Sequence, residues 1–179
     1  MAEAFINQVN RAVGIVTSSS NASIGIGLTW MSGISTAHVA IHDIVDNANF
    51  IAGTKVTQVG VSSVQLDRAS TNTVAATASN VSFLGPTTSY SSASATKSIL
   101  IGGTFANNTA NSVNLTVTVY DNSAETESQL AAKIPVPTGS SFVISDAGKT
   151  VLEGNDEVRV YCDTENAIDV NLSILKGVS

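Results

Sequence analysis

Apolar residues alternate with polar ones along several segments of the second half of the chain, and this pattern constrains the fold most. Two of these segments each place four apolar side chains on one face: Val113, Leu115, Val117 and Val119, then Ile168, Val170, Leu172 and Ile174. Shorter runs at 140–145 and 156–163 repeat the pattern. A period of two is typical of strands in an antiparallel sheet with one buried face. We therefore expect an all-β chain whose second half is an antiparallel β-sandwich.

The composition also favours strands. Charged residues make up only 12 % of the 179-residue chain, and Ser and Thr together about a quarter, whereas exposed helices normally carry many Glu and Lys residues. The segment 2–13 is the best helical candidate, but we expect it to be extended. The segment 134–139 holds Pro135 and Pro137, each of which removes a backbone donor, so we expect an edge or crossing segment there. Turn-forming residues predict turns at 107–111, 146–149, 153–156 and 164–167.

The first half reads as shorter strands. Residues 55–59 are expected to run extended and to return through 64–66, and residues 81–85 form another apolar strand. We predict a small β unit over 18–85, a linker or loop over 86–97 and the sandwich over 98–179. The N-terminal strand, 1–17, is expected to pair with the sandwich, which makes 18–85 an insertion. Whether that insertion is a separate domain stays open at this point.

Charge and cysteine content exclude several classes of protein. The net charge is −6 and the eight basic residues are scattered, so we expect neither nucleic acid nor a membrane surface as a partner. Cys162 is the single cysteine, which rules out an intrachain disulfide, and its place in an alternating run predicts a buried strand residue. The N-terminus lacks a signal-peptide pattern and no apolar run is long enough to span a membrane.

Histidines and nearby carboxylates form the first candidate metal site. His38 and His42 stand four residues apart, with Asp43 and Asp46 close by. On a helix the two imidazoles could share one ion. The local alternation favours a strand instead, where they would lie about 13 Å apart. We therefore predict no metal site there.

Two acidic turns remain as alternatives for Ca²⁺. They contain Asp121, Glu125 and Glu127, and Asp163, Glu165 and Asp169. Neither has the ligand spacing of a known calcium loop. The chain has no G-x-S-x-G elbow and no carboxylate pair typical of a hydrolase. We thus predict no catalytic, cofactor-binding or metal-binding residues, and no enzyme.

Aromatic residues raise one further possibility, a module that binds host-surface carbohydrate. Trp30 is the single tryptophan, and one tryptophan is more often a core or interface residue than a sugar platform. Five Asn-x-Ser/Thr triplets follow from the composition and need not be glycosylated; they begin at Asn21, Asn80, Asn107, Asn114 and Asn171.

Several stretches resemble structural proteins of tailed phages. The stretch "GTKVTQVGVSSVQLDRAS", with "VSFLG" after it, is similar to a β motif that recurs in such proteins. The C-terminal run resembles the end of small virion proteins of contractile-tailed cyanobacterial phages. It carries a "P-V-P-x-G" step at 135–139, a "V-L-x-x-x-D" turn at 151–156, a "V-x-V" strand at 158–160 and a final strand at 169–175. "NRAVGIVT", at 10–17, resembles their N-terminal strand.

This resemblance implies a virion structural protein that is assembled in the host cytoplasm. Within the virion we favour a capsid decoration or cement protein, because a small acidic β protein suits the outer capsid face. A neck, tail or fibre component is the alternative. The expected partners are other virion proteins, such as major capsid, neck or tail proteins, and further copies of the chain.

Overall fold

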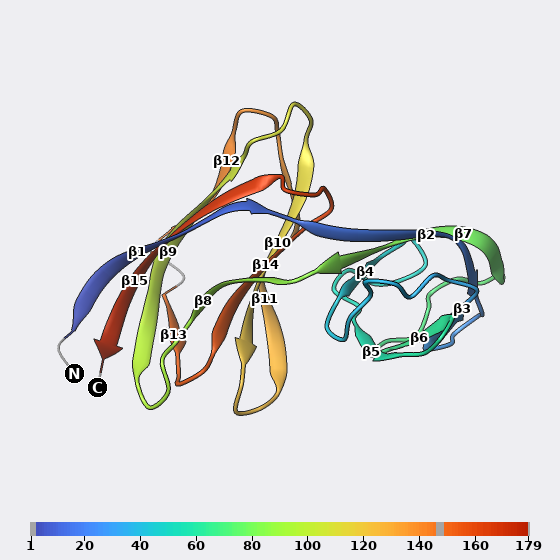
Figure 1. Ribbon diagram of the computed structural model, residues 1–179, viewed down its shortest axis with the longest axis horizontal. Helices are drawn as coiled ribbons and strands as arrows, with labels where there is room; N and C mark the ends of the chain where they lie inside the picture. Colours follow the sequence, from blue (N-terminus) through green and yellow to red (C-terminus); the bar gives the residue numbers. More distant parts are fainter. Residues whose placement is uncertain (1–2, 146–148, 179) are drawn as a thin grey trace. The chain divides into compact units, whose positions relative to one another are not determined.

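The computed structural model describes residues 3–145 and 149–178, and all of its regular elements are antiparallel β-strands (Figure 1). The chain divides into two compact units. Unit 1 comprises Met1–Gly14 and Thr87–Ser179, and unit 2 comprises Ile15–Pro86. The all-β prediction, with a sandwich and a smaller inserted β unit, is confirmed. Across the described residues, no helix is long and apolar enough to cross a membrane.

Unit 1 is a sandwich of a five-stranded and a four-stranded sheet. The five-stranded sheet has the order β1-β15-β9-β12, and β13 pairs with β9 beside β12. The four-stranded sheet has the order β11-β10-β14-β8. The strands are β1 (Ala4–Val13), β8 (Thr87–Ser91), β9 (Lys97–Asn107), β10 (Val113–Asp121), β11 (Thr126–Val136), β12 (Ser141–Ile144), β13 (Thr150–Leu152), β14 (Glu157–Cys162) and β15 (Ile168–Val178).

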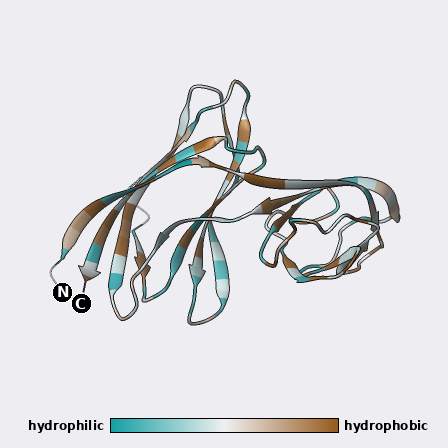
Figure 2. Ribbon diagram, viewed as in Figure 1, coloured by the Kyte–Doolittle hydropathy of each residue, from teal (hydrophilic) through white to brown (hydrophobic). Residues whose placement is uncertain are grey.

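The core of unit 1 lies between these sheets and uses the alternation seen in the sequence. Both runs of four apolar residues point inward and are buried, and Phe105 of β9 joins them with its ring centroid 6.2 Å from that of Phe142. Brown and teal positions alternate along the first part of β15 in Figure 2. The opposite face of β10 and β14 also holds buried residues, but these are polar or aromatic and include Thr118 and Tyr161.

Unit 2 is a small closed barrel. Its sheet has the order β4-β7-β2-β3-β6-β5. Backbone bonds close the sheet, since the N–H of Val45 donates to Thr54 and the N–H of Val56 donates to Asp43. Its strands are β2 (Ile15–Ile24), β3 (Trp30–Ser32), β4 (Ile44–Asp46), β5 (Val56–Val59), β6 (Ser63–Leu66) and β7 (Ala76–Gly85). A separate apolar core, which includes Met31 and Phe83, fills the barrel.

The N-terminal segment is extended, as expected, and links the two units. β1 pairs antiparallel with β15 from Ala4 opposite Lys176 to Val13 opposite Ile168. The chain then enters β2, so residues 15–17 belong to the barrel rather than to the N-terminal strand. Gly14 sits at this boundary with φ +135°, and a Cβ there would lie 2.1 Å from the carbonyl oxygen of Thr164.

The linker or loop predicted over 86–97 is wrong for its first half, which forms β8. This strand pairs with β14 from Ser91 opposite Glu157 to Thr87 opposite Val160. All of its residues carry a hydroxyl group, so no apolar alternation marks it in the sequence. The hydroxyl groups are used inside the fold, since that of Tyr90 lies 2.8 Å from that of Ser98.

Most of the predicted turns are where the sequence placed them. Turns or bends occur within 107–111, 153–156 and 164–167. Pro135 lies in β11, at the edge of the four-stranded sheet, as its missing donor requires. The turn expected at 146–149 lies mostly outside the described residues.

Candidate functional site

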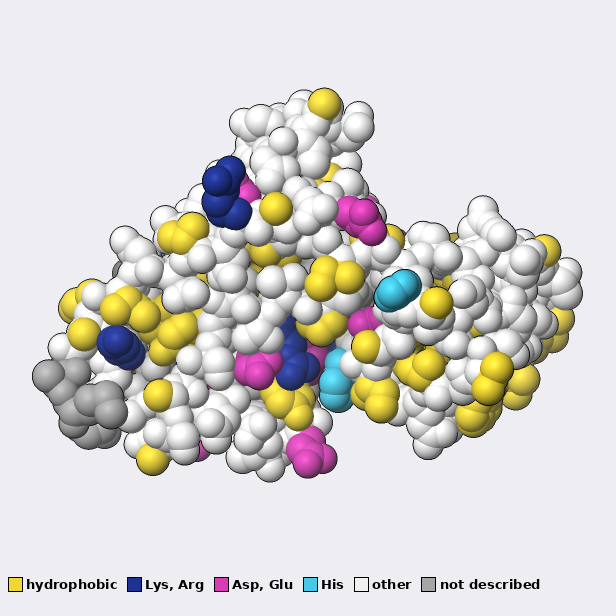
Figure 3. Space-filling view, in the orientation of Figure 1, with side chains coloured by type: hydrophobic (Ala, Val, Ile, Leu, Met, Phe, Trp, Pro, Cys, Tyr) yellow, Lys and Arg dark blue, Asp and Glu magenta, His cyan; other side chains and the backbone are white. Residues whose placement is uncertain are grey.

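The outer face of the five-stranded sheet carries an apolar row that crosses four strands. Phe5 of β1 lies opposite Leu175 of β15, Leu175 opposite Ile99 of β9, and Ile99 opposite Val151 of β13. We call these four residues the outer apolar row. Phe5 is 77 % exposed and Val151 56 % exposed, and the two residues between them are half-buried. In Figure 3, hydrophobic side chains gather on the side where β1 and β15 lie in Figure 1.

This row is a surface on which a partner could gain binding free energy. Cross-strand neighbours on one face lie about 5 Å apart, so the four side chains form a continuous strip. Covering apolar surface yields about 25 cal/mol per Å² removed from water. Val9 and Val143 add two more exposed apolar side chains to the same sheet. Contiguous exposed apolar surface on a folded protein is typical of interaction sites.

Unit 2 presents a second apolar surface around Trp30. Ile26, Leu28 and Trp30 are all exposed, and Trp30, at 46 %, is not part of the core. Ser70 fixes this segment: its hydroxyl donates to the carbonyl oxygen of Gly25 at 2.6 Å and accepts from the N–H of Leu28 at 3.2 Å. The backbone of Trp30 is held by the pairing of β3 with β6, where it lies opposite Gln65, and its side chain is accessible.

A polar cluster occupies one face of the four-stranded sheet, centred on Arg159 of β14. Its Nε lies 2.7 Å from Glu157 Oε2, its Nη1 lies 3.7 Å from Glu127 Oε2, and its guanidinium stacks 3.9 Å above the ring of Tyr120. The hydroxyl of Tyr161 donates to Glu127 at 3.0 Å. We call these five residues the Arg159 cluster. Thr118 also donates to Glu127, and Thr88 to Glu157.

The Arg159 cluster spans β10, β11 and β14, and the bond from Thr88 to Glu157 connects it to β8. The side chains of Arg159 and Glu127 are only 11 % and 4 % exposed. Burial lowers the pKa of Arg159, but the hydrogen bond and charge of Glu157 and the charge of Glu127 outweigh burial and raise it above its ordinary value. The guanidinium therefore stays charged. This favours a structural role, in which it links neighbouring strands, over a role in proton transfer.

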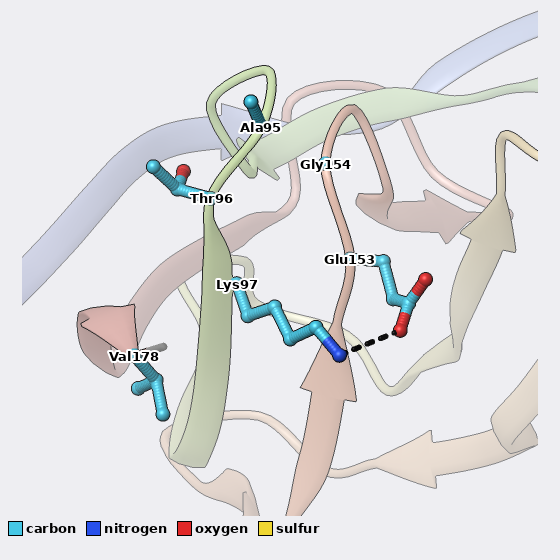
Figure 4. A pocket seen from close by; sticks show the side chains of 6 residues that line it. All are labelled: Ala95, Thr96, Lys97, Glu153, Gly154 and Val178. Carbon is cyan, nitrogen blue, oxygen red and sulfur yellow. Dashed lines mark ion pairs between the residues drawn. The ribbon is translucent and has the colours of Figure 1, made fainter.

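A shallow hollow on unit 1 is the site drawn in Figure 4. Lys97 Nζ lies 3.1 Å from Glu153 Oε1, and the two side chains face each other from β9 and the turn after β13. Both are more than half exposed, so this ion pair lies in solvent. The hollow is lined by Ala95, Thr96, Lys97, Glu153, Gly154 and Val178.

The strand predicted around the two histidines is wrong, because the chain forms two turns there. His38 and His42 have left-handed backbones, with φ of 65° and 79°. Asp43 holds the second turn: its N–H donates to the carbonyl oxygen of Ala40, and its carboxylate accepts from the N–H of Ala40 at 2.9 Å. Asp43 is buried, and burial raises the pKa of its carboxyl despite that hydrogen bond. Four residues of apparent alternation were too few to specify a strand.

The three acidic side chains of the first acidic turn lie in different environments. The carboxylate of Asp121 accepts from the N–H groups of Ser123 and Ala124 and from the hydroxyl of Ser123. The Ala124 bond is the main cause that lowers the pKa of Asp121. Glu125 lies exposed in the turn, whereas Glu127 belongs to the Arg159 cluster.

In the second acidic turn, two of the three carboxylates accept hydrogen bonds from backbone N–H groups. Asp163 accepts from the N–H and the side-chain amide of Asn114 at 2.9 and 2.7 Å, and Asp169 accepts from the N–H of Ala12 at 2.9 Å. Glu165 is exposed. Among residues 3–145 and 149–178, no three His, Cys, Asp or Glu side chains are grouped as metal ligands.

Cys162 is a buried residue of β14, as predicted. Burial raises the pKa of its thiol to about 11, so the reactive thiolate is scarce at neutral pH. Of the Asn-x-Ser/Thr triplets, Asn107 is buried and its side-chain amide donates to two backbone oxygens, while Asn21, Asn80, Asn114 and Asn171 are exposed.

Sequence reasoning missed the outer apolar row and the Arg159 cluster. The signal for the cluster was present in "EVRVYC", where the face opposite the core reads Glu157, Arg159 and Tyr161. The row had no such signal, because it depends on the order of four strands that are far apart in the sequence.

Comparisons with known proteins do not give this chain a family. No family model and no curated protein matches it. One similar solved structure holds the CBM22-1-GH10 modules of Clostridium thermocellum endo-1,4-beta-D-xylanase 10B with xylohexaose. The sequence identity is 9 % and the TM-score is 0.28, and the match covers 94 % of this chain and 29 % of that chain. Another is Arthrobacter globiformis T6 isomalto-dextranase with panose, 11 % identical, with a TM-score of 0.25, over 97 % of this chain and 34 % of that one. The chain thus spans about a third of either structure, and likeness at this level carries no argument.

Proposed function

We propose that this chain is a structural component of a tailed-phage virion that acts through its surfaces and without catalysis. The outer apolar row is the observation that carries the proposal: a rigid sandwich displays Phe5 and Val151 to solvent on one sheet face. A virion protein needs such a face, because the same weak contact is repeated at every symmetry-related copy and the contacts together hold the particle firmly. The resemblance of the N- and C-terminal segments to small phage virion proteins supports the same role.

Within the virion we favour decoration or cementing of the capsid. The net charge of −6 suits the outer surface of a head, since an acidic protein gains nothing from lying beside packaged DNA. In this role the outer apolar row lies against the major capsid protein. A neck, tail or fibre position is the alternative, and copy number distinguishes the two.

Binding to capsids tests the proposal directly. Purified capsids that lack the protein are mixed with wild type, with Val151→Asp or with Val61→Asp. Val151 belongs to the outer apolar row, while Val61 is a matched control that is 98 % exposed on unit 2. We expect Val151→Asp to weaken binding by about tenfold or more and Val61→Asp to bind like wild type. Equal binding of wild type and Val151→Asp would refute the docking face.

Copy number in purified virions tests the location. Quantitative mass spectrometry should find the protein in many copies, on the scale of the major capsid protein. A handful of copies per particle would place it in the neck or tail. Its absence from virions would reject the virion role altogether.

A second candidate function, recognition of a host-surface glycan, is favoured by the exposure of Trp30. An exposed tryptophan side chain can stack on a sugar ring, because the flat face of the indole is apolar. Tyr161 is buried and is unsuited to this, whereas Tyr90 and Tyr120 are half-buried. Glycan-array binding that is lost in Trp30→Ala would support this function, and an array without signal would reject it.

A further inference from the structure

The edge strand β1 is left open to a partner. Among the strands that the structure describes, it lies at the end of the five-stranded sheet and pairs with β15 alone. Proteins normally protect a long edge with a charge, a proline or a bulge, because its free backbone groups can pair with another strand. In β1, seven consecutive residues, 4–10, include no charge, proline or glycine. The register irregularity with β15 begins only after Asn10.

The outward face of β1 carries a pattern that is complementary to itself. Its exposed side chains alternate along the segment and are Glu3, Phe5, Asn7, Val9 and Arg11. The pattern is symmetric about Asn7: an acidic and a basic residue stand four positions to either side, and two apolar residues stand two positions to either side. A strand that runs antiparallel to this one about Asn7 would therefore meet a matching neighbour at every outward position.

We propose that a second copy of this chain adds its β1 antiparallel to β1 about a two-fold axis through Asn7. In this register Glu3 lies opposite Arg11 of the second copy, and Phe5 lies opposite Val9 of the second copy. Directly opposite side chains on one face of an antiparallel pair are in contact. Each charged pair and each apolar pair occurs twice, as an isologous dimer requires. Between the side chains, backbone hydrogen bonds form along an edge that pairs with no described strand of its own sheet.

Dimerisation through β1 would create a continuous sheet of ten strands, five from each copy. The two outer apolar rows would then lie on one extended face, which the edge-to-edge contact leaves open. A β1 dimer deepens the proposed function by naming a second copy as a partner. It is nevertheless tested on the isolated protein, so that failure of the dimer and failure of capsid binding are separate results.

A charge-reversal cycle tests the register. Molar mass of the full chain is measured by light scattering after gel filtration, and the dimer dissociation constant by sedimentation equilibrium. Glu3→Arg alone and Arg11→Glu alone each place two like-charged pairs across the two-fold axis. Each should raise the dissociation constant by about tenfold or more. The double variant restores opposite charges and should return to within about threefold of wild type. Glu125→Arg, an exposed charge reversal on the β10–β11 turn, is the control and should leave the constant unchanged.

Cross-linking through the axis tests the geometry independently. Asn7→Cys places two thiols opposite each other with Cα atoms about 5 Å apart, which a disulfide can bridge. Ser173→Cys is the matched control, because Ser173 is the exposed partner of Asn7 on β15 and would lie about 14 Å from its own copy. The native thiol of Cys162 is buried and does not compete. Mild oxidation should convert Asn7→Cys, but not Ser173→Cys, into a covalent dimer.

The outcomes are decisive in both directions. A dimer that the single reversals weaken, that the double reversal restores and that Asn7→Cys cross-links supports the proposal. A chain that remains monomeric at about 100 µM, well above the range of stable interfaces, overturns it. A dimer that is indifferent to both reversals overturns it as well, because it uses another surface.

Discussion

Replacing Arg159 by methionine should destabilise unit 1 strongly. The substitution keeps much of the side-chain volume but removes the positive charge that lies between Glu127 and Glu157. Glu127 is only 4 % exposed, so its carboxylate loses its countercharge without gaining water. Breaking a buried ion pair from one side costs about 3–5 kcal/mol. Because Glu157 is more accessible and recovers some hydration, we expect about 3 kcal/mol.

The chain offers a matched control and a separate reporter for each unit. Lys97→Met breaks the ion pair with Glu153, whose side chains are 54 % and 63 % exposed, and should cost less than about 1 kcal/mol. All three tyrosines lie in unit 1 and the single tryptophan lies in unit 2. Urea unfolding followed by tyrosine absorbance therefore reports on unit 1, and tryptophan fluorescence reports on unit 2.

The expected result is a large shift of the tyrosine transition for Arg159→Met, with little movement of the tryptophan transition. Adding Glu127→Leu to Arg159→Met should recover part of the loss, because an apolar pair no longer holds an uncompensated buried charge. If Arg159→Met costs no more than Lys97→Met, burial does not set the strength of this ion pair and the reasoning fails.

Three further predictions concern single groups. Gly33→Ala should destabilise unit 2 by about 3 kcal/mol, because φ is +73° and the new Cβ would lie 2.7 Å from the backbone oxygen of Asn21. Gly27→Ala is the control: φ is +63° but no atom lies within 4 Å of the new Cβ, so it should cost about 1 kcal/mol. Unfolding followed by tryptophan fluorescence measures both costs. Burial raises the pKa of Asp43 above its ordinary value of 3.8, so the folded barrel binds this proton more tightly than the unfolded chain. Unit 2 should gain stability relative to Asp43→Asn as pH falls through the folded pKa toward 3.8, and a parallel pH dependence of the two proteins would contradict this. Cys162 has a pKa of about 11 in the folded protein, so only about one thiol in a thousand is ionised at pH 8. It should therefore react with a thiol reagent at pH 8 only after unfolding. Rapid labelling of the native protein would disprove this protection.

The sequence predicted the strands that have one apolar and one polar face. β10 and β15 are long enough for alternation to show, and both appear as expected. β8 was missed because its residues have little apolar contrast, although Ser89 is buried. The strand expected at His38 was wrong because left-handed turn residues interrupt a pattern of only four positions.

The candidate sites were harder to predict because they depend on tertiary neighbours. Glu127 and Arg159 are 32 positions apart, and only the pairing of β10 with both β11 and β14 brings them together. The pattern from Glu3 to Arg11 is legible in the sequence. It gains meaning only once β1 is known to be an edge, and that follows from the order of strands rather than from any property of β1 itself.

The insertion of unit 2 has a consequence for how this chain could change over evolution. Ile15 and Gly85, near the two ends of the barrel segment, are directly opposite each other in β2 and β7. The polypeptide thus leaves the sandwich and comes back through neighbouring positions, so a short bridge from Gly14 to Thr87 could replace the whole barrel. A gene that loses or exchanges this stretch would keep every strand of the sandwich, so the barrel could diversify while the sandwich is inherited intact.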